Sequence, residues 1–265
     1  MYSGIAVYNT ENLGSKTACD LGEKFFTDID VPITGAGYYK MLKNGDHVGD
    51  HDIIEISFPD LKEKIKNNEV TAFRIYSEQK DAQPWHASFG YMTNEFGGFS
   101  YIDVQYPSVA DEPKATRGFL NSLSDKTPYS YGIKYCTDKV TKAFYYATGD
   151  NMINIYKYEN SSLFKRECPG RFNGLQRYKS TMLRMVYSIN VINAHHLDVI
   201  IGNVSLKKWI STDEKHGSLE VLENNLWLWT VEDTHLDEVN RYLGEAGVLI
   251  SWKPLAVKKT IRKLP

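Results

Sequence analysis

Several features that mark membrane proteins and redox or metal enzymes are missing from this 265-residue sequence. It has three cysteines, Cys19, Cys136 and Cys168, and none of them stands in a C-x-x-C pair or in a metal-type spacing. Isolated thiols suit a reducing compartment. No run approaches the ~18 uninterrupted apolar residues that span a bilayer, and residues 1–12 lack the positive and apolar regions of a signal peptide. We therefore expect a cytoplasmic protein that makes no membrane contact.

Motifs of enzymes are missing as well. The sequence contains no G-x-S-x-G nucleophile elbow and no glycine-rich phosphate loop, and Gly35 and Gly37 do not stand between a clear strand and a helix. Paired carboxylates do occur, but they lie just before predicted helices, where the helix dipole favours negative charge. We therefore predict no catalytic residue, no cofactor and no bound metal.

The composition indicates a folded protein with an acidic body. Hydrophobic residues make up 42% of the chain and aromatic residues 13%, including 18 tyrosines, which is enough for a substantial core. The net charge is −2, but residues 1–245 carry 26 basic and 33 acidic side chains, while residues 246–265 carry five basic and no acidic ones. An acidic body lacks the basic groove of a nucleic-acid binder and favours encounter with a basic protein.

The pattern of apolar residues and turn formers predicts helices and strands in an interspersed order. The first fifty residues are expected to form loops with one helix near residues 18–26. We further predict helices over 58–66, from Asp111 through Ser124 and after the caps Thr137, Ser205 and Thr234, strands over 70–77, 86–93, 98–106, 152–158, 219–222, 226–231 and 248–252, and a basic loop over 157–179. This order favours an α+β fold, with an antiparallel or mixed sheet and helices packed on one side. Since there is no repeat or linker, residues 1–265 are expected to form one domain or two closely packed halves.

One cluster of side chains could hold a metal. His195, His196 and Asp198 are residue types that bind zinc or iron, and His86 could join them if the fold brought it there. Adjacent residues point in different directions on a strand or helix, so we expect one of the two histidines to be packed and the other solvated. A metal-dependent hydrolase that uses this His/Asp cluster is the alternative function, and a scaffolding subunit is a third.

Residues 183–190, His196-Leu197, residues 205–210, 226–229 and 243–247 carry a resemblance. In these segments of its C-terminal third, the chain resembles bacterial immunity proteins of type VI secretion and polymorphic toxin systems. The resemblance implies a protein that sequesters a cognate toxin, commonly by occluding the toxin's active site. A toxin that acts in the cytoplasm is implied, and the acidic body favours a nuclease as the target, although an NAD-consuming or ADP-ribosylating toxin stays open.

We therefore expect an immunity protein rather than an enzyme, with a protein toxin as its partner and no direct contact with nucleic acid. Acidic and aromatic side chains on the loop at residues 94–98 and at helix starts are expected to bind the toxin. The predicted partner-binding residues are Glu95, Phe96, Asp111, Glu112, Glu232 and Asp233.

Overall fold

The structure is a computed structural model that describes residues 1–44, 50–79, 82–96, 98–108, 112–169 and 173–254. Its strands are β1 (Tyr2–Tyr8), β2 (Gly35–Met41), β3 (His51–Ile56), β4 (Phe73–Gln79), β5 (Ala82–Met92), β6 (Tyr101–Pro107), β7 (Tyr131–Thr137), β8 (Ile189–Asn193), β9 (Ile200–Ile201), β10 (Val204–Ser205), β11 (Ser218–Val221) and β12 (Leu226–Thr230). The α-helices are α1 (Ser15–Asp28), α2 (Phe58–Lys66), α3 (Glu112–Lys126), α4 (Val140–Thr148), α5 (Ser161–Glu167), α6 (Ala194–Leu197), α7 (Leu206–Ile210) and α8 (Leu236–Glu245). Short 3-10 helices are η1 (Asp150–Met152), η2 (Arg177–Lys179), η3 (Glu214–His216) and η4 (Asp233–His235).

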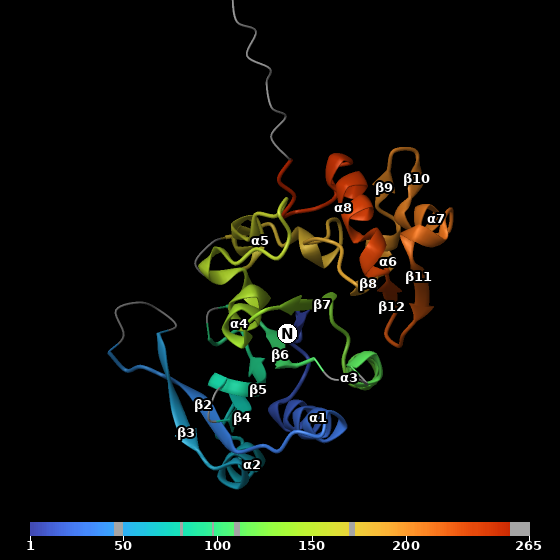
Figure 1. Ribbon diagram of the computed structural model, residues 1–265. Coiled ribbons are helices and arrows are strands. Elements are labelled where there is room, and N and C mark those ends of the chain that lie inside the picture. Colours follow the sequence, from blue (N-terminus) through green and yellow to red (C-terminus); the bar gives the residue numbers. More distant parts are fainter. Residues whose placement is uncertain (45–49, 80–81, 97, 109–111, 170–172, 255–265) are drawn as a thin grey trace, which may run out of the picture.

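A ten-stranded antiparallel sheet runs through the molecule in the order β11-β12-β8-β7-β1-β6-β5-β4-β2-β3. The N-terminal strand β1 lies inside this sheet, where Ile5 pairs with Val104 of β6 on one side and with Lys134 of β7 on the other. In Figure 1 the sheet passes from β11 and β12 at the right, through β7 and β6 at the centre, to β2 and β3 at the lower left. Residues far apart in the sequence are therefore joined by one set of ladder hydrogen bonds.

Helices cover both faces of the sheet. Along β1, Ile5 and Val7 point into one core, while Ala6 and Tyr8 point into the other. Helices α1, α2 and α3 pack on the first face, and α4, α5 and α8 on the second (Figure 1). The α+β class and the antiparallel sheet are confirmed, but the helices are not confined to one side. The reason is that the central strands bury both of their faces, so each face needs a covering layer.

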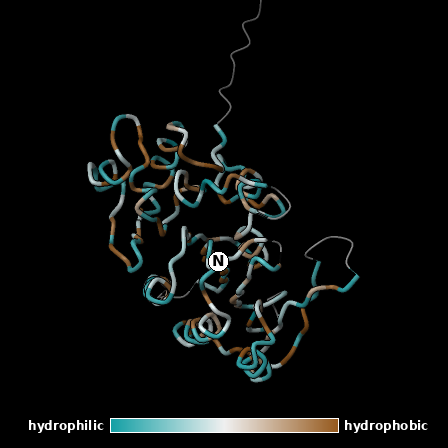
Figure 2. Tube along the Cα trace, turned by 180° about the vertical axis from the view of Figure 1, so that it is seen from behind, coloured by the Kyte–Doolittle hydropathy of each residue, from teal (hydrophilic) through white to brown (hydrophobic). Residues whose placement is uncertain are grey.

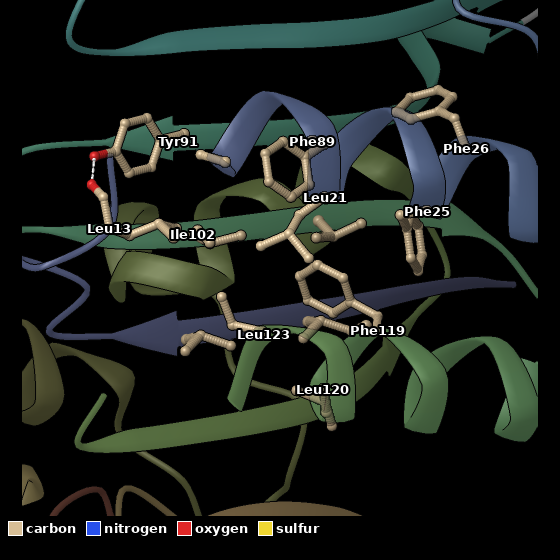
Figure 3. Packing of buried hydrophobic residues seen from close by; sticks show 14 of the residues in the cluster. Leu13, Leu21, Phe25, Phe26, Phe89, Tyr91, Ile102, Phe119, Leu120 and Leu123 are labelled. Carbon is tan, nitrogen blue, oxygen red and sulfur yellow. Dashed lines mark hydrogen bonds between the residues drawn. The ribbon is translucent and has the colours of Figure 1, made fainter. Parts of the chain in front are cut away.

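The first core is built from large side chains of α1, α3 and β5, shown in Figure 3. Phe25 of α1 meets Phe119 of α3 edge to face, with ring centroids 5.3 Å apart. The hydroxyl of Tyr91 donates a hydrogen bond to the carbonyl of Leu13, which ties the start of α1 to β5. Figure 2 shows that hydrophobic and hydrophilic stretches alternate along the chain.

The second core surrounds a fully buried arginine. Arg184 donates to the carbonyl of Tyr146 at 2.6 Å, and its guanidinium lies 3.7 Å from the Tyr146 ring centroid. Glu159 is also buried, with Oε1 3.8 Å from Arg184 Nη2 and 2.6 Å from the Tyr146 hydroxyl. Burial raises the pKa of Glu159, and the nearby Arg184 works in the opposite direction. These bonds hold the segment before β8 against α4.

Most predicted helices and strands are present. The helix predicted over 58–66 is α2, the helix at 18–26 lies inside α1, and the strands near 70–77, 86–93 and 98–106 are β4, β5 and β6. The hairpin of β11 and β12 is confirmed, as is the cap of α7, where the Ser205 hydroxyl accepts from the Lys208 N–H at 3.3 Å. The predicted basic loop over 157–179 contains α5 and η2, because Asn160 caps a helix there.

Five local predictions are wrong. The first fifty residues contain β1 and β2, because a strand buried on both faces shows no alternation of apolar and polar residues. Residues 152–158 form a turn in which Glu159 Oε2 accepts the N–H of Ile155 at 3.0 Å. Residues 248–252 make isolated bridges on two sides instead of a ladder. The Thr137 hydroxyl donates to the Lys139 carbonyl, and α8 follows directly on η4, so neither α4 nor α8 has the predicted side-chain cap.

Candidate functional site: the surface around η4 and α8

The predicted loop at residues 94–98 is only partly available to a partner. Glu95 is exposed and accepts a hydrogen bond from the Thr71 hydroxyl at 2.7 Å. Phe96 is buried at 7% exposure, with its ring centroid 5.8 Å from that of Tyr39 and 5.3 Å from that of His51. The loop thus closes a small core beside β2, and Phe96 does not contribute to the surface as predicted.

The other predicted residues lie at the start of α3 and beside η4. Asp111 lies outside the described residues, and Glu112 is the first residue of α3. Glu232 and Asp233 are exposed and line a hollow of about 300 Å³, together with Pro113, the residue that follows Glu112. The structure therefore brings the start of α3 and the acidic residues Glu232 and Asp233 to one place, which we call the α3–η4 hollow.

Basic side chains contribute to the lining of the α3–η4 hollow as well. Arg117 and Lys134 line it, and Arg117 forms an ion pair with Glu220 of β11 and donates to the Thr230 hydroxyl at 3.3 Å. These two contacts hold the Arg117 side chain against β11 and β12 at the edge of the sheet. On the acidic side, Glu232 Oε2 lies 3.7 Å from His235 Nε2.

A larger concavity lies beyond η4, between α8 and the segment from α7 to η3. This groove encloses about 690 Å³, and we call it the α8 groove. Its walls include Trp209, His216, His235, Glu238, Tyr242 and Glu245. Because η4 contributes Asp233 to the hollow and His235 to the groove, the two concavities flank the same short turn.

Three aromatic rings stack along one wall of the α8 groove. The Trp209 ring is 3.6 Å from the His216 ring, with 14° between their planes, and 5.3 Å from the Tyr242 ring, with 11° between their planes. The His216 Nδ1–H donates to the Trp209 carbonyl at 2.8 Å, and the Trp229 indole donates to the His216 carbonyl at 2.8 Å. These bonds fix the stack to β12.

The sequence patterns do not predict this groove. Trp209 lies in the short helix predicted after Ser205, and it is 6% exposed. The available signal was on α8, where Glu238, Arg241, Tyr242 and Glu245 follow helical spacing on the face away from the core. That pattern indicates only that this face of α8 is exposed to solvent. The other wall of the groove comes from α7, and local periodicity does not predict where α7 lies relative to α8.

The histidine cluster does not assemble into a metal site. His196 is buried: its Nδ1 accepts the Asn193 N–H at 3.3 Å, and its Nε2 donates to the Tyr178 carbonyl at 2.9 Å. Burial lowers the pKa of His196 to about 4. His195 is exposed, as predicted for one packed and one solvated ring. Both nitrogens of His196 are occupied, so it offers no lone pair to a metal.

His86 is also remote from that cluster. It lies on β5, four places along the sheet from β8, which is roughly 19 Å at the usual strand spacing. Among the described residues, no group of three or more His, Cys, Asp or Glu side chains could hold a metal ion. The set of His86, His195, His196 and Asp198 is therefore corrected, because His86 lies on a distant strand and both ring nitrogens of His196 are already hydrogen-bonded. In the described part of the chain, no helix is both long and apolar enough to cross a bilayer.

Comparison with known proteins gives a likeness of fold. No protein-family model matches the chain, and no curated protein matches its sequence. Among solved structures, it is similar to the Pseudomonas aeruginosa T6SS protein PA0821, with a TM-score of 0.58 and 10% sequence identity over 97% of this chain and 76% of that one. At this identity, the comparison shows that the two chains share a fold.

Proposed function

We propose that this protein acts by binding rather than by catalysis, as a cytoplasmic immunity protein that sequesters a cognate bacterial toxin. The observation that carries the proposal is the surface around η4, where exposed Glu232 and Asp233 stand between two concavities. Exposed carboxylates beside hollows suit a basic, convex partner, because complementary charge raises the rate of encounter and fixes orientation.

The fold likeness supports a role in type VI secretion. The similar solved structure is described as a T6SS protein, and the C-terminal segments that resemble immunity proteins include α7, β12 and the end of α8. Two of these, α7 and α8, form the α8 groove. We infer that the toxin docks on this part of the molecule and that the protein occludes the toxin's active site. A nuclease is the target class that an acidic body favours.

Co-purification tests the proposal. The protein would be tagged, co-expressed with an inactive form of the toxin encoded by the neighbouring gene, and recovered by affinity purification. We expect a stable complex, and we expect the double variant Glu232→Lys, Asp233→Lys to lose it. The matched control is Asp20→Lys, Glu63→Lys, which makes the same change in net charge on exposed positions of α1 and α2.

Three outcomes are informative. Recovery of the complex with wild type and control but not with the η4 variant supports the proposal and its location. Equal loss in both variants would indicate a general charge effect and contradict the placement at η4. Failure of the wild-type protein to retain the toxin would contradict the immunity function itself.

A further inference from the structure

The face of α8 that lines the groove combines carboxylates with an aromatic ring. Glu238 and Tyr242 are one helical turn apart, a spacing at which Cβ atoms lie roughly 5–6 Å from each other. Tyr242 is 49% exposed, and Glu238 and Glu245 are exposed as well. Within the described residues, neither glutamate makes a side-chain hydrogen bond or an ion pair within 4 Å. These groups are therefore open to a ligand.

The Tyr242 ring is held in a defined orientation. It lies nearly parallel to Trp209, which is almost fully buried and in turn stacks on His216. A ring fixed in this way offers its face to a ligand without losing much conformational entropy on binding. The electron-rich face of such a ring attracts cations.

The charged side chains that line the groove favour a ligand with a positive charge. Three carboxylates line it, those of Asp213, Glu238 and Glu245, against the cations Lys215 and Arg241. An aromatic face next to a free carboxylate suits a guanidinium group, since its planar fork can stack on the ring and hydrogen-bond to the carboxylate at the same time. An ammonium group lacks that planar geometry.

We propose that the α8 groove binds an arginine side chain of the toxin, with the guanidinium stacked on Tyr242 and hydrogen-bonded to Glu238. The identity of the partner rests on the proposed function, whereas the chemistry of the ligand rests on the groove. Lys215 and Arg241 also line the groove and oppose a cationic ligand, so the proposal depends on direct contact of the guanidinium with Tyr242 and Glu238.

Titration of the isotope-labelled full chain, followed by NMR, tests the proposal. The probes are N-acetyl-arginine amide, its uncharged isostere N-acetyl-citrulline amide, N-acetyl-lysine amide and inorganic phosphate. We expect the arginine probe to shift the Trp209 indole and the α8 amide signals in a saturable way, and the citrulline probe to leave them unchanged. Glu238→Gln and Tyr242→Leu should each weaken the response by roughly three- to tenfold, while Glu63→Gln on α2 should not.

The other results overturn the proposal. An equal response to the citrulline probe would show that the positive charge of the ligand is not required. An equal response to the lysine probe would show that the planar guanidinium is not required. A response to phosphate alone would indicate an anion site at Lys215 and Arg241. No shift at the groove with any probe contradicts it outright. If the wild-type protein retains the toxin but the arginine probe does not bind, the immunity function stands and the arginine site falls. If the arginine probe binds but the wild-type protein retains no toxin, the reverse holds.

Discussion

Arg74 of β4 and Asp103 of β6 meet over Gly90, which lies between them on β5. Arg74 pairs with Gly90 in one ladder, and Gly90 pairs with Asp103 in the next. Arg74 Nη2 donates to both carboxylate oxygens of Asp103, at 2.7 and 2.8 Å, and both residues are almost fully buried. A side chain on the intervening strand would block this contact, so the ion pair depends on the missing Cβ of Gly90.

Gly90→Ala is expected to destabilise the protein strongly. The added methyl group would overlap Arg74 Nη2 and Asp103 Oδ1, and separating a buried ion pair costs about 3–5 kcal/mol. Urea unfolding measures the change. Gly118→Ala in α3 is the control, because its Cβ would meet nothing within 4 Å and alanine favours a helix by about 0.5–1 kcal/mol. Equal midpoints for Gly90→Ala and wild type would contradict this view of the β4–β5–β6 contact.

The Arg184–Glu159 pair should show coupling in a double-mutant cycle. Arg184→Met leaves the buried Glu159 carboxylate without its nearby cation and should cost about 3–5 kcal/mol. Glu159→Gln in the same chain removes the unpaired charge and should recover part of that loss. Additive effects of the two substitutions would show that the residues act independently.

Stability should fall in mild acid because of His196. Burial lowers the pKa of its ring from 6.5 to about 4 in the folded protein, so between these values the unfolded chain binds more protons. The contribution is fully present above pH 6.5 and is lost as the pH falls towards 4, by up to roughly 3 kcal/mol. Denaturant midpoints across this range should slope less in His196→Gln than in wild type. An unchanged slope would exclude His196 as the cause.

Association with the toxin should depend on salt. If exposed carboxylates at η4 steer a basic partner, the association rate should fall as ionic strength rises, since the Debye length shrinks from about 10 Å at 0.1 M to about 3 Å at 1 M. Stopped-flow measurements on wild type and on Glu232→Lys, Asp233→Lys test this. A rate independent of salt in wild type would show that steering by these side chains is absent.

Elements with a clear local signal could be predicted from the sequence. The alternation in β11 and β12 and the periodicity of α2 specify those elements without reference to the rest of the chain. The sequence pattern does not predict β1, because this strand is buried on both faces. It also contains Gly4, where a Cβ would overlap the Tyr135 ring. Its place at the centre of the sheet depends on β6 and β7, which lie far along the chain.

The candidate site was predictable in part. The acidic pair at Glu232 and Asp233 is exposed and lines a hollow, and the start of α3 lies at the same hollow. Phe96 was misplaced, because a loop residue is expected at the surface unless a distant side chain covers it, and here Tyr39 does. The α8 groove could not be predicted, because it exists only where α7 packs beside α8. Local sequence patterns do not specify that tertiary contact.

Survival of bacteria that express the active neighbouring toxin tests the central claim most directly. The toxin would be induced in the cytoplasm with this protein, with its Glu232→Lys, Asp233→Lys variant, or with an empty vector, and viable colonies would be counted. The proposal predicts survival with wild type, and death with the variant and with the vector. Death in the presence of correctly folded, abundant wild-type protein would contradict the account.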